Sequence, residues 1–254
     1  MKTLTEEELM ANYNKFVGIV ESVFTGEKKE NLLKMVEFFA DRLITAPASG
    51  KEHFHSTYPG GLLVHLLNVY EMSLELYEIW KVKSNHIDYT LDELTLVALF
   101  HDFGKLGDLD EDYYVPQDND WRRANMGELY KINQHLVNMP VPDRTLYLLQ
   151  HFNVKVNKNE WINIKVHDGL YDEGNKSYLV VWSDDRKLKS HLPYLIHHAD
   201  MMATIMEYEQ WKFDEKDIPA TSKVKTKPKK TLNNVLSNAK IDKTTFDKLF
   251  DTGG

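Results

Sequence analysis

The chain has 254 residues, no cysteine, 42% hydrophobic residues and a formal net charge of −8. This length and hydrophobic content allow a substantial buried core. Without cysteine there are no disulfides and no thiolate ligands, so any bound metal must be held by His, Asp or Glu. The negative charge argues against a generally basic nucleic-acid-binding surface, although it leaves room for a local basic patch.

The sequence contains no run of about 18 apolar residues of the kind that spans a membrane. Near the N-terminus, Glu6, Glu7 and Glu8 stand where a signal peptide would need a basic and then an apolar stretch. We therefore expect a soluble, cytoplasmic protein with no membrane partner.

The first part of the chain is expected to be helical. Apolar residues at helical spacing predict helices over residues 6–24 and 28–43, the second carrying Leu32, Met35, Val36 and Phe39. We expect residues 1–50 to form N-terminal helices that pack on a core domain spanning residues 51–213.

A helix is predicted to begin near Pro59, because proline is favoured in the first turn. Leu62, Leu66 and Val69 form one apolar stripe along it, and His65 lies on the same face. His65 is therefore predicted to point inward. Taken alone, such a residue is more often a hydrogen-bonded core histidine than a metal ligand.

The next predicted helix ends in two polar residues. Thr90 and Glu93 have the spacing of a capping box that opens the helix, and its apolar residues run up to His101 and Asp102. Gly104 is the expected left-handed stop. An imidazole and a carboxylate at the inner end of an apolar helix would lose several kcal/mol of hydration unless a cation compensates them, and a bound metal would do so.

Residues 108–125 break the helical pattern. The stretch 112–116, a polar turn over 117–120 and the sequence Trp121-Arg122-Arg123 together predict a short β-hairpin. Helices are expected again over 143–150 and from Asn157 to near His167, with Gly169 as the stop.

The last predicted elements of the core domain are a strand and a helix. The apolar stretch 177–182 predicts a short strand, and Pro193 opens a helix that carries Asp200. From residue 214 the composition becomes polar and lysine-rich, with Lys223, Lys225 and Lys227 among its charges. We expect 214–254 to be a flexible basic linker followed by a short helical segment, available to bind a partner.

The motifs occur in the order His65, His101-Asp102, His167, Asp200, with Pro-Gly-Gly-Leu ahead of His65 and Gly104-Lys105 after the His-Asp pair. This order resembles the HD superfamily of metal-dependent phosphohydrolases, over roughly residues 54–207. The branch with Gly-Gly-Leu before the first His, which includes 3′-5′ exoribonucleases and phage-encoded nucleotide hydrolases, is the most similar. The resemblance implies an all-α HD-domain helical bundle, with the hairpin as an insert.

The resemblance also implies the ligand set. His65, His101, Asp102 and Asp200 would hold one divalent ion. In two-metal members, two further histidines between the His-Asp pair and the last Asp hold a second ion that Asp102 bridges. His135 and His167 are the candidates here, with His151 as a competitor for either place. Nitrogen and oxygen ligands suit Mn, Fe, Mg, Ni, Co or Zn.

Three cationic residues are candidates for contacting phosphate. Lys105 stands at the family's phosphate-contacting position, and Arg122 and Arg123 could reach the same cleft, because guanidinium groups pair well with phosphate oxygens. The alternative for each is an ordinary surface charge.

The expected function is hydrolysis of a nucleotide or short oligonucleotide phosphoester, with Asp102 and Lys105 as catalytic residues and a metal-bound hydroxide as the attacking group. Two alternatives stay open. Some members of the superfamily are di-iron oxygenases, and the chain could also be a non-enzymatic HD module that binds a partner through its tail.

Overall fold

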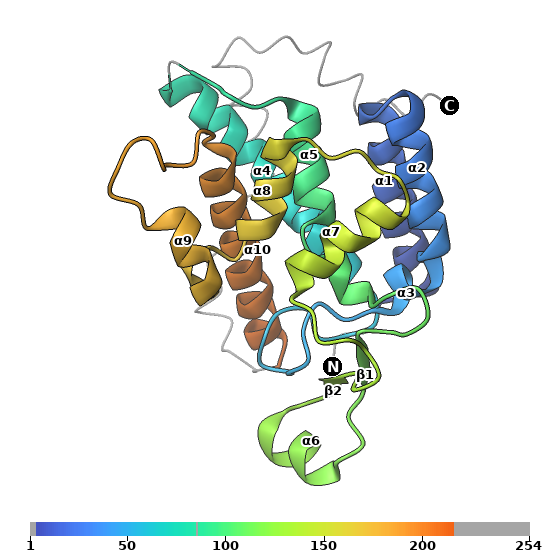
Figure 1. The fold of residues 1–254 in the computed structure, drawn as a ribbon. Helices are drawn as coiled ribbons and strands as arrows, with labels where there is room; N and C mark the ends of the chain where they lie inside the picture. The colour runs from blue at the N-terminus through green and yellow to red at the C-terminus, as the bar shows by residue number, and fades with distance from the viewer. Residues whose placement is uncertain (1–3, 85, 216–254) are drawn as a thin grey trace. The chain divides into compact units, whose positions relative to one another are not determined.

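The structure is a computed structural model that describes residues 4–84 and 86–215. It is mostly helical, with one small two-stranded sheet, so the all-α prediction is confirmed at this level (Figure 1). The helices that form its body are α1 (Glu6–Val23), α2 (Gly26–Phe38), α3 (Ala40–Thr45), α4 (Gly61–Lys83), α5 (Leu91–Phe100), α7 (Val141–His151), α8 (Lys158–Val166) and α10 (Leu192–Glu215). All belong to one compact unit, Met1–Glu215.

Four helices form the centre of this unit. In Figure 1, α4, α5, α8 and α10 lie side by side, and α4 packs against both α5 and α10, while α8 packs against α5 and α10. The apolar stripe of α4 enters the core as predicted, since Leu62, Leu66 and Val69 are fully buried. Helices α1 and α3 cover α4 from one side.

The helix predicted over 28–43 is interrupted. Helix α2 ends at Phe38, and α3 begins at Ala40 after Phe39 departs from helical geometry (φ −96°, ψ 12°). The break lets the ring of Phe39 pack edge-on against Phe103, with ring centroids 5.9 Å apart. Helical periodicity alone does not reveal such a break, because the apolar face continues through it.

The predicted hairpin exists, but its second strand lies later in the chain than expected. Strand β1 (Tyr114–Pro116) pairs antiparallel with β2 (Tyr130–Ile132), and a short helix, α6 (Asp120–Met126), fills the connection. The prediction that Trp121-Arg122-Arg123 forms a strand is therefore wrong. Asn119 caps this helix by accepting a hydrogen bond from the backbone N–H of Arg122, a local signal that competes with strand pairing.

The strand predicted over 177–182 is also wrong. Two 3₁₀ turns, Gly169–Tyr171 and Glu173–Asn175, lead into the short helix α9 (Lys176–Leu179), and residues 180–182 are irregular. The sheet found among the described residues consists of β1 and β2 alone, so this apolar stretch pairs with no strand there, and Trp182 is 95% exposed.

No helix among the described residues has both the length and the hydrophobicity needed to cross a membrane. Helix α10 extends to Glu215, two residues past the predicted end of the core domain at residue 213. The linker and short helical segment predicted beyond it lie outside the described residues.

Candidate metal centre

Four central helices bring the predicted ligands together. His65 lies in the buried face of α4, His101 follows the last residue of α5, His167 follows the last residue of α8, and Asp200 lies in α10. His65, His101 and His167 are almost completely buried, and Asp102 is 4% exposed. Five side chains from four separate segments of the sequence therefore share one polar site inside an apolar core.

The turn after α5 places His101 and Asp102. Here Gly104 is not the left-handed stop that the sequence predicted, because it lies in a 3₁₀ turn, Phe103–Leu106, and the positive φ falls at Gly107 (+100°). Gly104 is required for another reason. A Cβ at this position would lie 2.3 Å from the carbonyl oxygen of Val141, so only glycine lets the turn pack against α7.

A threonine of α7 fixes this turn. The hydroxyl of Thr145 accepts a hydrogen bond from the N–H of Gly104 (2.8 Å) and donates one to the carbonyl oxygen of His101 (3.1 Å). Thr145 is fully buried, so both hydrogen bonds are shielded from water. The backbone around Asp102 is therefore held from both sides.

The end of α8 repeats this arrangement. His167 is its C-cap residue, and Gly169 has the left-handed conformation that the sequence predicted (φ +58°). A Cβ at Gly169 would lie 2.5 Å from the ring of His197. The Nδ1 of His197 in turn donates to the carbonyl oxygen of His167 (2.8 Å), which ties the end of α8 to α10.

All three buried histidines have their Nδ1 atoms engaged. His101 Nδ1 lies 3.0 Å from the carbonyl oxygen of Ala98, and His167 Nδ1 lies 2.8 Å from that of Ile164. Because a carbonyl can only accept, Nδ1 carries the proton in both rings. His65 Nδ1 lies 3.2 Å from the carboxylate of Glu207, which has the same effect. The Nε2 lone pair of each neutral ring is therefore free to bind a cation.

These Nε2 atoms face two carboxylates. His65 Nε2 lies 3.2 Å from Asp200 Oδ1 and 3.7 Å from Asp102 Oδ2. His101 Nε2 lies 3.6 Å from Asp102 Oδ2, and His167 Nε2 lies 3.6 Å from Asp102 Oδ1. His101 Nε2 is buried and has no hydrogen-bond partner among the described residues. An unsatisfied buried nitrogen beside carboxylates is the arrangement that a metal ion would complete.

The pKa values reflect an excess of buried negative charge. Burial alone would lower the pKa of His65, but the carboxylates of Glu207 and Asp200 outweigh it and raise this pKa to about 10. Burial likewise opposes the shift at His167, where Asp168 and Asp102 raise the pKa to about 9. Without a metal, these carboxylates draw protons onto two of the three imidazoles, so the site favours a cation at its centre.

The pKa of His101 shifts in the opposite direction. Burial, together with repulsion from His167 and His65, lowers its pKa to about 4, although Asp102 acts against this shift. The ring of His101 therefore stays neutral at pH 7. Among the three imidazoles it is the one that can coordinate a metal without first losing a proton.

Lys105 lies at the edge of the same site. Its Nζ donates to Asp102 Oδ2 at 2.5 Å, and its side chain is 16% exposed. Burial acts to lower the pKa of Lys105, but Asp102 outweighs it and raises this pKa above its usual range. Lys105 also holds the pKa of Asp102 well below its usual range, against the effect of burial. Both groups are therefore charged at pH 7.

The side chains form overlapping groups with the spacing of metal ligands. One group is His65, His101 and Asp102, and another is His101, His167 and Asp200. Both contain His101, whose Nδ1 proton is committed to Ala98, so it can offer only Nε2 and bind only one ion. These two groups therefore form one centre with five side chains around it, and a third group, His55, His65 and Glu207, adjoins this centre through His65.

The other predicted histidines lie elsewhere. His135 is exposed in the turn after β2 and belongs to none of the candidate ligand groups found among the described residues. His151 is exposed at the end of α7, where its ring contacts Tyr147 and Phe152. The structure thus brings His167, but not His135, to the predicted site.

The two predicted phosphate-binding arginines lie on α6 and pair with carboxylates. Arg122 Nη1 donates to Glu128 Oε2 at 2.8 Å, and Arg123 forms an ion pair with Asp120. Only Arg122 lines a cavity described below, whereas the side chain of Arg123 is tied to its own helix and to the carbonyl oxygen of Gln117.

Two residues at the site were missed by the sequence analysis. Glu207 lies two helical turns after Asp200 on α10, so both face α4, and its carboxylate accepts hydrogen bonds from Ser56 Oγ (2.7 Å) and Asn68 Nδ2 (2.9 Å) as well as approaching His65. The ring of His55 contacts that of His65 in a tilted arrangement, with centroids 4.8 Å apart. The seven-residue spacing of Asp200 and Glu207 is the signal that could have identified Glu207.

Glu207 is expected to tune metal binding by orienting His65. Replacing it with Gln should weaken metal affinity about 10- to 100-fold without abolishing binding, because the Nδ1–H of His65 loses its charged acceptor. Glu209 on the same helix is exposed, so Glu209→Gln is the matched control. Equal metal affinity of the two variants in a calorimetric titration would show that Glu207 does not act on the site.

In comparisons with known proteins, no family model, no curated protein and no solved structure matches this chain. The assignment of the site consequently depends on the geometry and chemistry of its own residues.

Proposed function

We propose that the chain is a metal-dependent phosphohydrolase of the HD type that acts on the phosphoester of a nucleotide or short oligonucleotide. One observation carries the proposal. Three buried histidines have their Nδ1 atoms held by acceptors, and their Nε2 atoms face Asp102 and Asp200. Buried imidazoles with this orientation beside carboxylates are typical of ligands for a divalent cation.

A divalent ion bound in such a site supplies Lewis acidity, which lowers the pKa of water and polarises a phosphoryl oxygen. The chain's own residues would contribute the rest. His65, His101 and His167 would bind the ion through Nε2, and Asp102 and Asp200 would balance its charge. Gly104 and Thr145 would keep Asp102 in place while substrate binds.

Lys105 is the group we propose for phosphate. It lies beside Asp102 and remains charged, so it can donate to a phosphoryl oxygen and offset negative charge that develops there. The side chains of Lys105 and Asp200 are 16% and 17% exposed, unlike the histidines, so a substrate would reach the centre past them.

A centre with one ion is better supported than one with two. His101 offers a single nitrogen, and His135 is exposed outside the ligand groups of the described chain. The di-iron oxygenase alternative requires two ions, so the geometry supports it less than hydrolysis at a single ion. The presence of the complete set of ligand side chains argues against a vestigial, non-enzymatic site.

Lys105→Ala is expected to reduce kcat/KM on a phosphorylated substrate by roughly 5- to 150-fold, which corresponds to about 1–3 kcal/mol. Bound metal should be unchanged, since Lys105 is not a ligand. Lys155→Ala removes a lysine whose side chain is 81% exposed and is the control. If Lys105→Ala loses its metal as well as its activity, Lys105 maintains the structure of the metal site and its contact with phosphate is not supported.

The proposed activity is tested by a hydrolysis screen. Mononucleotides, cyclic dinucleotides and short oligonucleotides would each be incubated with the full chain and Mn, Mg, Ni or Co, and product release measured. The proposal predicts metal-stimulated hydrolysis of at least one of them, lost in Asp102→Asn. A metal-loaded protein that hydrolyses none of these classes would contradict it.

A further inference from the structure

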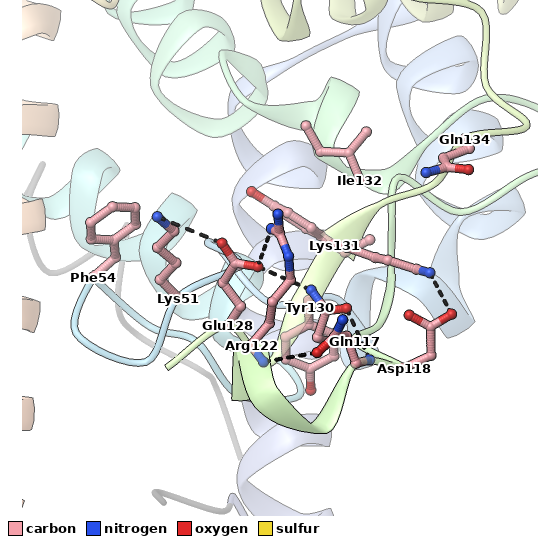
Figure 2. A pocket seen from close by; sticks show the side chains of 13 residues that line it. Lys51, Phe54, Gln117, Asp118, Arg122, Glu128, Tyr130, Lys131, Ile132 and Gln134 are labelled. Carbon is pink, nitrogen blue, oxygen red and sulfur yellow. Dashed lines mark hydrogen bonds and ion pairs between the residues drawn. The ribbon is translucent and has the colours of Figure 1, made fainter. Parts of the chain in front are cut away.

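A cavity of about 600 Å³ lies beside the β-hairpin (Figure 2). This volume is within the range of sites that bind small molecules. The cavity lies between the loop that precedes α4 on one side and β1, α6 and β2 on the other. Its lining residues include Phe54, Tyr114, Gln117, Arg122, Glu128 and Tyr130.

Backbone hydrogen bonds join the two sides of this cavity. The N–H of Leu129 donates to the carbonyl oxygen of Gly50 (2.9 Å), and the N–H of Glu52 donates to that of Gly127 (2.7 Å). Gly50 is needed here, because a Cβ would lie 2.8 Å from the carbonyl oxygen of Tyr130. The loop and the hairpin therefore form one continuous wall.

The same loop reaches the candidate metal centre. Phe54 lines the cavity, whereas the ring of the next residue, His55, contacts that of His65 with centroids 4.8 Å apart. Ser56 follows and donates to the carboxylate of Glu207. Consecutive residues of one loop thus contact the cavity and the centre.

A tyrosine makes a second connection. Tyr114 of β1 lines the cavity, and it lies close enough to Lys105 for the two to interact electrostatically. Lys105 in turn pairs with Asp102. Tyr114 therefore belongs both to the lining of the cavity and to the surroundings of Lys105.

The lining combines aromatic rings with hydrogen-bonding groups. Phe54 is 47% exposed, so much of its ring is accessible, and Lys51 Nζ lies 5.6 Å from the centroid of that ring. Gln117 is buried and donates to Glu128 Oε2 (3.1 Å), which also accepts from Arg122. In Figure 2, dashed lines link the carboxylate of Glu128 to both Lys51 and Arg122.

The charges of the lining favour a polar ligand over an apolar one. The lining contains three cationic side chains and two carboxylates. Lys51 and Arg122 form ion pairs with Glu128, and Lys131 forms one with Asp118. Flat aromatic rings stack on nucleobases irrespective of base identity, and amide side chains can hydrogen-bond to base edges or sugar hydroxyls.

We infer that this cavity binds the nucleoside part of a nucleotide, with the base against Phe54 and Tyr130 and the phosphate directed past Tyr114 toward Lys105. The inference rests on the proposed function and specifies its substrate class. It also assigns a role in ligand binding to Arg122 and not to Arg123, because only Arg122 of the two lines the cavity.

Binding of unphosphorylated probes tests the cavity without depending on hydrolysis. Ligand-observed NMR titrations of the full chain would compare adenosine, uridine and ribose. The nucleosides are expected to bind more tightly than ribose, and Phe54→Ala should weaken nucleoside binding about fivefold or more, the range of base–aromatic stacking. Ribose binding should be unaffected by this substitution.

Two matched controls make the test specific. Trp121 is an aromatic residue of α6 that is 64% exposed and does not line the cavity, so Trp121→Ala should leave nucleoside binding unchanged. Arg122→Ala should weaken binding more than Arg123→Ala. Thermal unfolding would verify that each variant is folded, which is expected because all four side chains are substantially exposed.

The outcomes separate this inference from the proposed function. Nucleosides that bind no better than ribose, or equal effects of Phe54→Ala and Trp121→Ala, would overturn the cavity assignment even if nucleotides are hydrolysed. Phe54-dependent nucleoside binding in a metal-loaded protein that hydrolyses neither nucleotides nor short oligonucleotides would support the cavity and contradict the phosphohydrolase proposal.

Discussion

Replacing His101 with Ala, or Asp102 with Asn, is expected to remove bound metal and to lower turnover at least about a thousandfold. Among the three ligand histidines, His101 has the imidazole that is neutral at pH 7 without deprotonation. Asp102 is the carboxylate of the described chain that lies within 4 Å of the Nε2 atoms of all three. Losing either should leave too few ligands to retain the ion through purification. Elemental analysis and the hydrolysis assay would measure the two effects.

The two substitutions could disturb folding in different ways, so the same loss of metal in both would be attributed to the lost ligand and not to misfolding. His101→Ala opens a cavity in the core, whereas Asp102→Asn keeps the shape but removes the charge that pairs with Lys105. His151→Ala changes an exposed histidine outside the site and is the control. Folded variants that keep the full metal content would refute the assignment of these ligands.

Metal binding is expected to raise the melting temperature by roughly 8–16 °C. An ion at a thousand times its dissociation constant stabilises the folded state by about 4 kcal/mol, and each kcal/mol shifts the transition of a chain of this size by about 2–4 °C. The effect should disappear on adding a chelator and in His101→Ala. Calorimetry of the metal-loaded and chelated full chain would measure it.

This stabilisation should grow as the pH rises from 6 to 8. In the metal-free chain the pKa values of His65 and His167 are raised to about 10 and about 9, so both rings carry protons that a metal must displace. The same raised pKa values stabilise the metal-free fold below the unfolded value of about 6.5, and this contribution is lost as the pH rises through about 9 to 10. Because the metal must displace fewer protons as the pH rises, the first effect widens the difference between the metal-loaded and metal-free forms at higher pH. A difference that shrinks toward pH 8 would contradict this account.

Local signals in the sequence predicted much of the helical framework. The capping box expected at Thr90 is present, the helix expected from Asn157 also begins with a capping box, and the two fix where α5 and α8 begin. The lengths of these two helices then determine that His101 and His167 fall at their C-terminal ends. The apolar stripe around His65 likewise sets the direction of its ring, because helical periodicity specifies which face is buried.

Features that depend on contacts between distant segments could not be predicted in this way. His55 lies in a loop with no periodic pattern, and it reaches His65 only because the loop is bonded to the hairpin. The hairpin itself was misplaced, since the pairing of β1 with β2 spans the whole of α6. The role of Gly104 depends on the approach of α7, which no local signal in the sequence indicates.

Anomalous diffraction from crystals of the full chain grown with Mn or Co tests the central claim most directly. The account predicts an anomalous peak within bonding distance of His101 Nε2, His65 Nε2 and a carboxylate oxygen of Asp102. No peak at this position at saturating metal, or a peak bound by other residues, would show that these side chains form a buried ion-pair network and not a metal centre.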